Sequence, residues 1–143
     1  MAYNICENNK PEDIFRLEEE IFGNSAYTLK QIEDISTMPD MYKIISLREK
    51  ESDIVAGYVI VFNNSDSLEI MKIGVAPQYR EKGLGTVLIN EMKKSRMEIF
   101  LEVRENNITA REFYKKNGFK EAGKRKNYYR DTGESAIIMV FNF

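Results

Sequence analysis

The spacing of the apolar residues changes near residue 40, and this change limits the folds that the chain can adopt. Between residues 12 and 36 the apolar side chains recur at helical spacing, which predicts helices over 11–23 and 28–36. Pro11 suits a first helical turn, and Thr28 with Gln31 forms the pattern of a capping box. From Tyr42 onward the apolar runs alternate or are continuous, which is typical of strands.

The remaining elements are expected in a mixed order. They are an edge strand over 1–8, strands over 42–48, 54–63 and 67–75, a helix over 85–95, a strand over 98–104, a helix over 108–117, and strands near 120–129 and 135–141. Gly118 fits the C-terminal end of the last helix. This order predicts one α/β domain over residues 1–143, with helices on the faces of a mixed sheet. The acidic run Glu18–Glu20 is expected on a solvated helix face.

Composition excludes several kinds of chemistry. The chain has no histidine and a single cysteine, Cys6, so Ser-His-Asp and Cys-His catalysis, an internal disulfide and a cysteine-based metal site are all excluded. A net charge of -2 gives no general attraction to nucleic acid. No apolar run approaches the roughly 20 residues of a membrane span, and no signal peptide is expected. We therefore expect a cytoplasmic protein without a metal site.

The segment VAPQYREKGLGT, residues 75–86, follows a predicted strand and opens a predicted helix. Gly83 and Gly85 allow the backbone to bend and a ligand to approach closely. The free N–H groups of a first helical turn then form an anion site, and Arg80 and Lys82 add positive charge. The segment lacks both the Walker lysine-serine pair and the third glycine of a dinucleotide motif. On spacing alone, a turn that merely uses glycine remains the alternative.

A second segment, LEVRENN, covers residues 101–107 and is followed by FYKKNGF at 113–119. Strand alternation places Leu101 and Val103 on one face, and Glu102 and Arg104 on the other. A charge inside a central strand is costly to bury unless it is paired or faces a cleft. Two readings remain: Glu102 and Arg104 pair with their neighbours at a strand end, or Glu102 faces an acceptor site.

These segments together resemble the GNAT acetyltransferases. REKGLG, residues 80–85, is similar to the Arg/Gln-x-x-Gly-x-Gly signature of that superfamily, and IGVAP at 73–77 is similar to the strand end before it. LEVRENN, FYKKNGF and RKNYY at 125–129 resemble the bacterial ribosomal-protein-alanine N-acetyltransferases, with matches from about residue 18 to 139. The resemblance implies the α/β (α+β) GNAT fold, with a mixed, mostly antiparallel sheet of six to seven strands flanked by about four helices.

The resemblance also implies site residues. Glu102 is expected to act as general base toward the amine, and Tyr114 as general acid toward the leaving thiolate. The alternative for Tyr114 is a helix residue that packs on the sheet. Tyr27, Tyr128 and Tyr129 are expected at the acceptor groove together with Glu102. The residues expected to bind acetyl-coenzyme A are Ile73, Gly74, Val75, Arg80, Glu81, Lys82, Gly83, Leu84, Gly85, Thr86, Asn107 and Tyr114.

The chemistry of these residue types suits those roles. An α-amine has a pKa of about 7.7–8.0, so at neutral pH most of it is protonated and cannot attack a thioester. In a chain without histidine, a carboxylate is the natural proton acceptor, and a phenol can donate to the thiolate. A backbone N–H near Gly74–Val75 is expected to polarise the carbonyl.

The expected function is direct transfer of an acetyl group to the N-terminal amine of a protein, such as a ribosomal protein, by a monomer or weak dimer. The chain lacks the Pro-Trp pair that those relatives usually carry after the first helix, and this leaves the acceptor open. A small amine, such as a polyamine or aminoglycoside, is the second hypothesis. A silent module that binds acyl-coenzyme A is the third.

Overall fold

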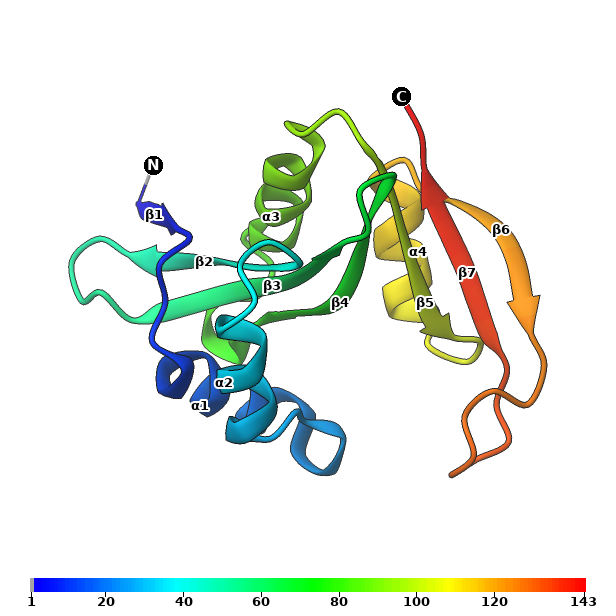
Figure 1. The fold of residues 1–143 in the computed structure, drawn as a ribbon, viewed down its shortest axis with the longest axis horizontal. Helices are drawn as coiled ribbons and strands as arrows, with labels where there is room; N and C mark the ends of the chain where they lie inside the picture. Colours follow the sequence, from blue (N-terminus) through cyan, green and yellow to red (C-terminus); the bar gives the residue numbers. More distant parts are fainter. Residues whose placement is uncertain (1) are drawn as a thin grey trace.

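The strands form one sheet in the order β1-β2-β3-β4-β5-β7-β6 in the computed structural model, which describes residues 2–143 (Figure 1). Neighbouring strands run antiparallel except β4 and β5, which run parallel. The predicted mostly antiparallel sheet of six to seven strands is therefore confirmed. The strands are β1 Tyr3–Cys6, β2 Tyr42–Glu49, β3 Val55–Asn63, β4 Ser67–Val75, β5 Glu98–Arg104, β6 Lys120–Arg125 and β7 Ala136–Phe141.

Four α-helices flank this sheet, as predicted. They are α1 Pro11–Phe22, α2 Leu29–Ser36, α3 Leu84–Lys93 and α4 Ile108–Lys116, and two short 3-10 turns cover Gly23–Ser25 and Pro77–Tyr79. The predicted capping box starts α2: the Gln31 N–H donates to Thr28 Oγ1 at 3.1 Å, and the Thr28 N–H donates to Gln31 Oε1 at 2.8 Å. None of the helices described is long and apolar enough to cross a membrane.

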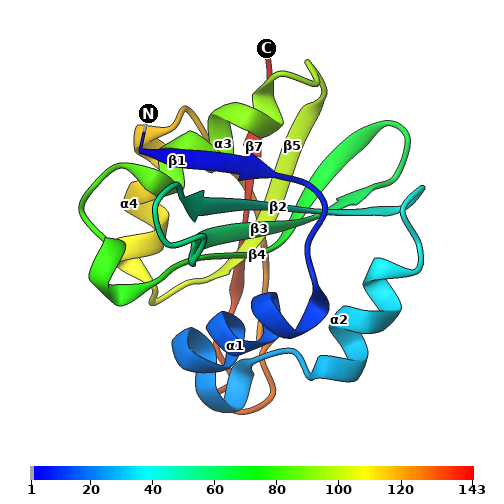
Figure 2. The ribbon, with the colours of Figure 1, turned by 90° about the vertical axis from the view of Figure 1, so that its left-hand side faces the viewer.

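The helices cover the two faces of the sheet unequally. Helices α1 and α2 pack on one face of β2–β4, and α3 packs on the opposite face (Figures 1 and 2). The α1–α2 side is filled by Ile14, Leu17, Ile32, Tyr58 and Ile60, among others. On the other side, apolar residues of α3 and α4 pack on the sheet in one larger core. Each helix is amphipathic, so burial of its apolar face against the sheet accounts for this layering.

Strands β4 and β5 stay together only at their starts. Ser67–Glu69 pairs with Glu98–Phe100, and beyond this point the two strands diverge (Figure 1). The register of β4 against β3 also shifts, from Lys72 opposite Ile60 to Ile70 opposite Val61, so Met71 is the extra residue of a β-bulge. A bulge bends its strand and increases the local twist. The divergence leaves the facing edges of β4 and β5 without strand partners over their C-terminal halves.

Two expectations from the sequence were wrong. The strand predicted over 120–129 ends at Arg125, because Asn127 has a φ of 54° and an extended ladder cannot pass through that conformation. Tyr128 and Tyr129 therefore lie in the turn before β7. Glu18 was expected on a solvated face but is fully buried. It follows Ile14 by four residues and Leu17 by one, so it lies on the inward stripe of α1, where polar partners satisfy it.

Candidate active site

A cleft of about 780 Å³ opens where β4 and β5 diverge. Most of the residues predicted for cofactor binding and catalysis line it: Ile73, Gly74, Val75, Arg80, Glu81, Gly83, Leu84, Gly85, Thr86, Glu102, Asn107 and Tyr114. Lys82, Tyr27, Tyr128 and Tyr129 do not line it. The fold thus brings the glycine segment and the LEVRENN segment, which are separate in sequence, to opposite walls of one cavity.

Several lining residues were not predicted. Thr109, Ala110, Phe113 and Lys116 add a face of α4, and Ile21, Phe22, Met71 and Lys72 add part of α1 and the bulged part of β4. The α4 residues recur at helical spacing on the same face as Tyr114, so periodicity alone could have identified them. The α1 and β4 residues gave no such signal, because only the tertiary fold brings them beside β5.

The loop before α3 presents free backbone donors to this cleft. The backbone N–H groups of Glu81 through Thr86 donate to no acceptor within the part of the chain that the structure describes. Glu81 and Gly83 have φ values of 64° and 76°, so left-handed residues alternate with ordinary ones along the loop. Such alternation turns successive N–H groups toward one point and forms an anion-binding concavity. The positive end of the α3 dipole adds to this potential.

Arg80 is turned back onto β4 instead of extending freely. Its Nε donates to the carbonyl oxygen of Val75 at 3.1 Å. This bond fixes the end of β4 to the start of the glycine loop. The guanidinium consequently stays at the edge of the cleft, where its charge adds to the potential of the free N–H groups.

Gly85 is required by a close approach of α4. A Cβ atom at this position would lie 2.9 Å from Cζ of Phe113. Any larger residue at position 85 would push that ring, which also lines the cleft. The glycine therefore sets the width of the cleft between α3 and α4.

Glu102 offers one unsatisfied carboxylate oxygen. Its side chain is 17% exposed, and its Oε1 lies 3.4 Å from Nη2 of Arg125. Its Oε2 is buried and has no hydrogen-bond partner in residues 2–143. A buried acceptor without a partner is costly, and such groups are concentrated at functional sites. The arrangement leaves Oε2 free to accept a proton or a hydrogen bond from a ligand.

A second carboxylate lies near Glu102. Glu69 is on β4, and its paired residue on β5, Phe100, is two positions before Glu102. Burial, and then the negative charge of Glu102, raise the pKa of Glu69, while Arg125 lowers it. Burial and the neighbouring carboxylate thus both disfavour the ionised form of Glu69.

Tyr114 is a buried phenol next to the same cleft. It is 6% exposed, and its ring makes edge contacts with Phe113 and Phe119 at centroid distances of 5.2 and 5.5 Å. Burial raises the pKa of its hydroxyl well above the ordinary value, so the group is protonated at neutral pH. Because Tyr114 lines the cleft, its neutral hydroxyl can donate a proton to a ligand bound there.

Asn107 has a structural task as well as a place in the cleft. Its side-chain oxygen accepts the N–H of Ala110 at 3.2 Å and so caps α4. The amide NH₂ is not used by this cap and remains for a ligand. The sequence predicted the ligand contact but not this cap.

The three predicted groove tyrosines lie outside the cleft lining. Tyr27 is half-buried and follows the short turn after α1. Tyr128 is 46% exposed and stacks edge-on against Tyr129, which lies beneath the guanidinium of Arg104 at 4.0 Å. Arg104 is itself paired with Asp131 and Glu134, so its charge is neutralised.

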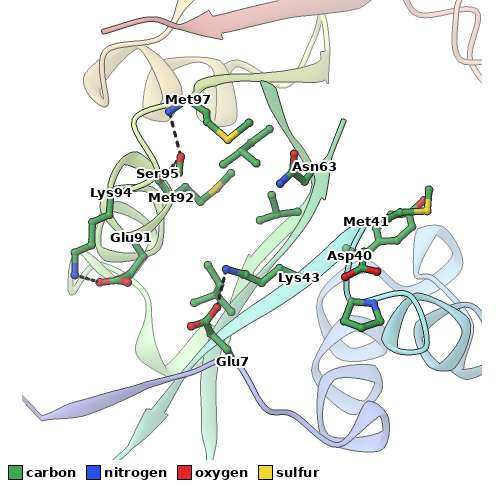
Figure 3. Close-up of a pocket in the computed structure, with 15 residues that line it drawn as sticks. Glu7, Asp40, Met41, Lys43, Asn63, Glu91, Met92, Lys94, Ser95 and Met97 are labelled. Atoms are coloured by element: carbon green, nitrogen blue, oxygen red, sulfur yellow. Dashed lines mark hydrogen bonds and ion pairs between the residues drawn. The ribbon is translucent and has the colours of Figure 1, made fainter. Parts of the chain in front are cut away.

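A second cavity, of about 360 Å³, lies between β2 and the end of α3 (Figure 3). Four of its charged side chains form two ion pairs: Lys43 with Glu7 at 2.9 Å, and Lys94 with Glu91 at 2.5 Å. It contains none of the predicted site residues.

Comparison with known proteins identifies relatives of this chain and similar solved structures. A Bacillus subtilis protein, provisionally named a ribosomal protein bS18-alanine N-acetyltransferase, is 38% identical over 96 residues. That match covers 64% of this chain and 63% of the relative, so the chain spans less than two thirds of that relative. The Escherichia coli ribosomal-protein-S18-alanine N-acetyltransferase structure has a TM-score of 0.83 at 26% identity, covering 97% of this chain and 92% of that one.

A second similar structure was solved with a ligand. It is a Bacillus anthracis protein, provisionally named a streptothricin acetyltransferase, in complex with acetyl coenzyme A. Its TM-score is 0.64 at 28% identity, covering 72% of this chain and 63% of that one. The family model for the acetyltransferase (GNAT) domain matches residues 43–121, which include the glycine loop, Glu102 and Tyr114. The chain belongs to the GNAT acetyltransferase family.

Proposed function

We propose that this chain transfers the acetyl group of acetyl-coenzyme A to the N-terminal amine of a protein, and that the acceptor is a ribosomal protein. The observation that carries the proposal is the cleft between β4 and β5. One of its walls presents the free N–H groups of residues 81–86, and the other presents the unpartnered Oε2 of Glu102. The names of the Bacillus subtilis and Escherichia coli relatives support the choice of acceptor.

The cleft fits coenzyme A on its own features. A diphosphate needs several convergent donors, and the glycine loop offers them without competition from the protein's own acceptors. The open edge of β4 over Ile73–Val75 offers backbone groups to an extended chain with amide groups. Acetyl-coenzyme A supplies the acetyl group as a reactive thioester when it is bound.

Glu102 and Tyr114 are proposed to move the two protons of the reaction. Oε2 of Glu102 takes a proton from the attacking amine, directly or through one water, and it has no competing hydrogen bond. The Tyr114 hydroxyl, held in its neutral form by burial, gives a proton to the leaving sulfur. Asn107, through its free amide NH₂, and Arg80 orient the ligand at the cleft edge.

A purified chain assayed with acetyl-coenzyme A tests the proposal. The acceptors are peptides carrying N-termini of ribosomal proteins, and thiol release and peptide mass are measured. We expect acetylation of an α-amine, with no reaction when the peptide N-terminus is blocked. Coenzyme A binding without transfer to any amine would overturn the proposal in favour of a binding module. In cells, mass spectrometry of ribosomal proteins after deletion of the gene would identify the acceptor as the protein that loses its acetyl group.

A small-molecule amine is the second candidate, and the name of the Bacillus anthracis structure favours it. The same assay includes a polyamine and an aminoglycoside at matched concentrations. A kcat/KM for a small amine above that of every peptide would support this candidate and contradict a protein acceptor.

A further inference from the structure

A buried charged cluster joins α1 to the cleft, and the proposed proton transfers do not use it. Glu18 of α1 is 0% exposed. Its Oε1 accepts a hydrogen bond from the Tyr58 hydroxyl of β3, and its Oε2 accepts the backbone N–H of Tyr27 at 2.8 Å. Lys72 of β4 lies 3.2 Å from the same Oε2. The Glu18 carboxylate therefore contacts β3, β4 and the loop after α1 at the same time.

Lys72 connects that cluster to the cleft wall. Besides Glu18, its Nζ donates to the carbonyl of Ser25 at 2.9 Å and lies 3.8 Å from the centre of the Phe22 ring. Lys72 and Phe22 both line the cleft. The ammonium has partners in three directions, so its charge is used to hold the loop and not to contact a ligand.

The loop from Phe22 to Tyr27 needs such support. Its sequence, FGNSAY, contains no proline, and Gly23 adopts a φ of 54°. Inside the loop, the Ala26 N–H donates to the Gly23 carbonyl at 3.1 Å, and this bond closes a single short turn. A short glycine-containing loop gains further order from contacts with its surroundings. Glu18 and Lys72 supply such contacts at Tyr27, Ser25 and Phe22.

The loop reaches the cleft through Phe22, which lines it together with Lys72 and Glu102. Burial, and then the charges of Glu18, Tyr42 and Glu69, raise the pKa of Tyr27. Glu69 in turn senses the charge of Glu102. Phe22 lines the cleft from this loop, whereas the free N–H groups of residues 81–86 come from a different segment.

We propose that Glu18, acting through Lys72, is a positioning residue that fixes the loop Phe22–Tyr27 as the wall against which the acceptor binds. The inference rests on the proposed function, because it assigns this end of the cleft to the acceptor. If the loop is already ordered before the acceptor binds, the binding free energy is not reduced by the entropy cost of ordering it. Loss of the anchor should weaken acceptor binding and leave acetyl-coenzyme A binding unchanged.

Steady-state kinetics of Lys72→Met and Glu18→Gln test the inference. Methionine keeps the unbranched stem of lysine and removes the ammonium. We expect the acceptor KM to rise by about tenfold or more, while kcat and the acetyl-coenzyme A KM stay within about twofold. Lys30→Met is the matched control, since Lys30 is 78% exposed and pairs only with the exposed Asp34. Tyr58→Phe removes one hydrogen bond to Glu18 and keeps both charges, so it serves if Glu18→Gln does not fold.

Hydrogen exchange provides a readout that does not depend on turnover. In Lys72→Met we expect faster exchange at the amides of residues 22–27 and unchanged exchange in α3. A folded variant whose acceptor KM equals that of the parent, or whose two KM values rise together, overturns the inference. If the parent acetylates no amine, the proposed function fails, and unchanged exchange at residues 22–27 would then refute the anchor itself.

Discussion

Replacing Glu102 by glutamine should separate catalysis from folding. The substitution keeps the shape of the side chain and removes the proton acceptor whose Oε2 has no partner in the structure. A general base contributes about 10²–10⁴ in rate, or about 2.7–5.4 kcal/mol of barrier. The ion pair with Arg125 is also lost, but that arginine side chain is 54% exposed, so the pair contributes only about 0–1 kcal/mol to stability. We therefore expect a folded protein with a kcat lowered by about 10²–10⁴.

The pH dependence sharpens this expectation. With an α-amine pKa of about 7.7–8.0, roughly 10–17% of the acceptor is unprotonated at pH 7, and nearly all is unprotonated at pH 9. Raising the pH can therefore increase the rate of Glu102→Gln by at most about tenfold. Even at pH 9 the variant should stay about tenfold or more below the parent at pH 7.

The assay measures thiol release from acetyl-coenzyme A with the acceptor that the parent uses, alongside cofactor binding by calorimetry. Glu98→Gln is the matched control, because Glu98 is on the same strand but exposed and outside the cleft. We expect Glu98→Gln to behave as the parent and Glu102→Gln to bind acetyl-coenzyme A normally. A kcat for Glu102→Gln within about threefold of the parent would refute the assignment, since the effect of a general base is at least about 10².

Three further outcomes are expected. Tyr114→Phe keeps the ring contacts and removes the free hydroxyl, so calorimetry should find unchanged acetyl-coenzyme A binding while kcat falls by about 10²–10⁴; an unchanged kcat contradicts the role of general acid. Gly85→Ala should raise the acetyl-coenzyme A KM, because the added Cβ meets the Phe113 ring. Gly83→Ala should mainly lower Tm, because its added Cβ meets no other atom but the positive φ at this position strains any residue other than glycine. Glu69→Gln should raise Tm at pH 7, because the raised pKa of Glu69 means that the folded state disfavours its carboxylate. This gain in Tm should vanish below the unfolded-state pKa of about 4.3, where the carboxyl is protonated in both states. A gain in Tm that persists at such a low pH contradicts the reasoning.

The parts of the site that could be predicted were those that local rules determine. A glycine loop between a strand and a helix, and the alternation that buries Leu101 and Val103 away from Glu102, follow from the sequence alone. Local rules failed where a tertiary partner decides the outcome. The residue type of Glu18 predicts exposure, but Tyr58 and Lys72 reverse that prediction. The separation of β4 from β5 was likewise unpredictable, because each strand is locally regular until it loses its neighbour.

The parallel pairing of β4 and β5 explains why the cleft lies where it does. Each strand is followed by a helix, so α3 and α4 both begin at the carboxyl ends of this pair, the usual ligand position beside parallel strands. The two helix starts differ in one respect. The Asn107 side chain caps α4 and uses an N–H of its first turn, whereas Gly83 has no side chain and leaves the first turn of α3 unsatisfied. Of the two positive helix ends at the cleft, α3 is therefore the one that still needs an anion.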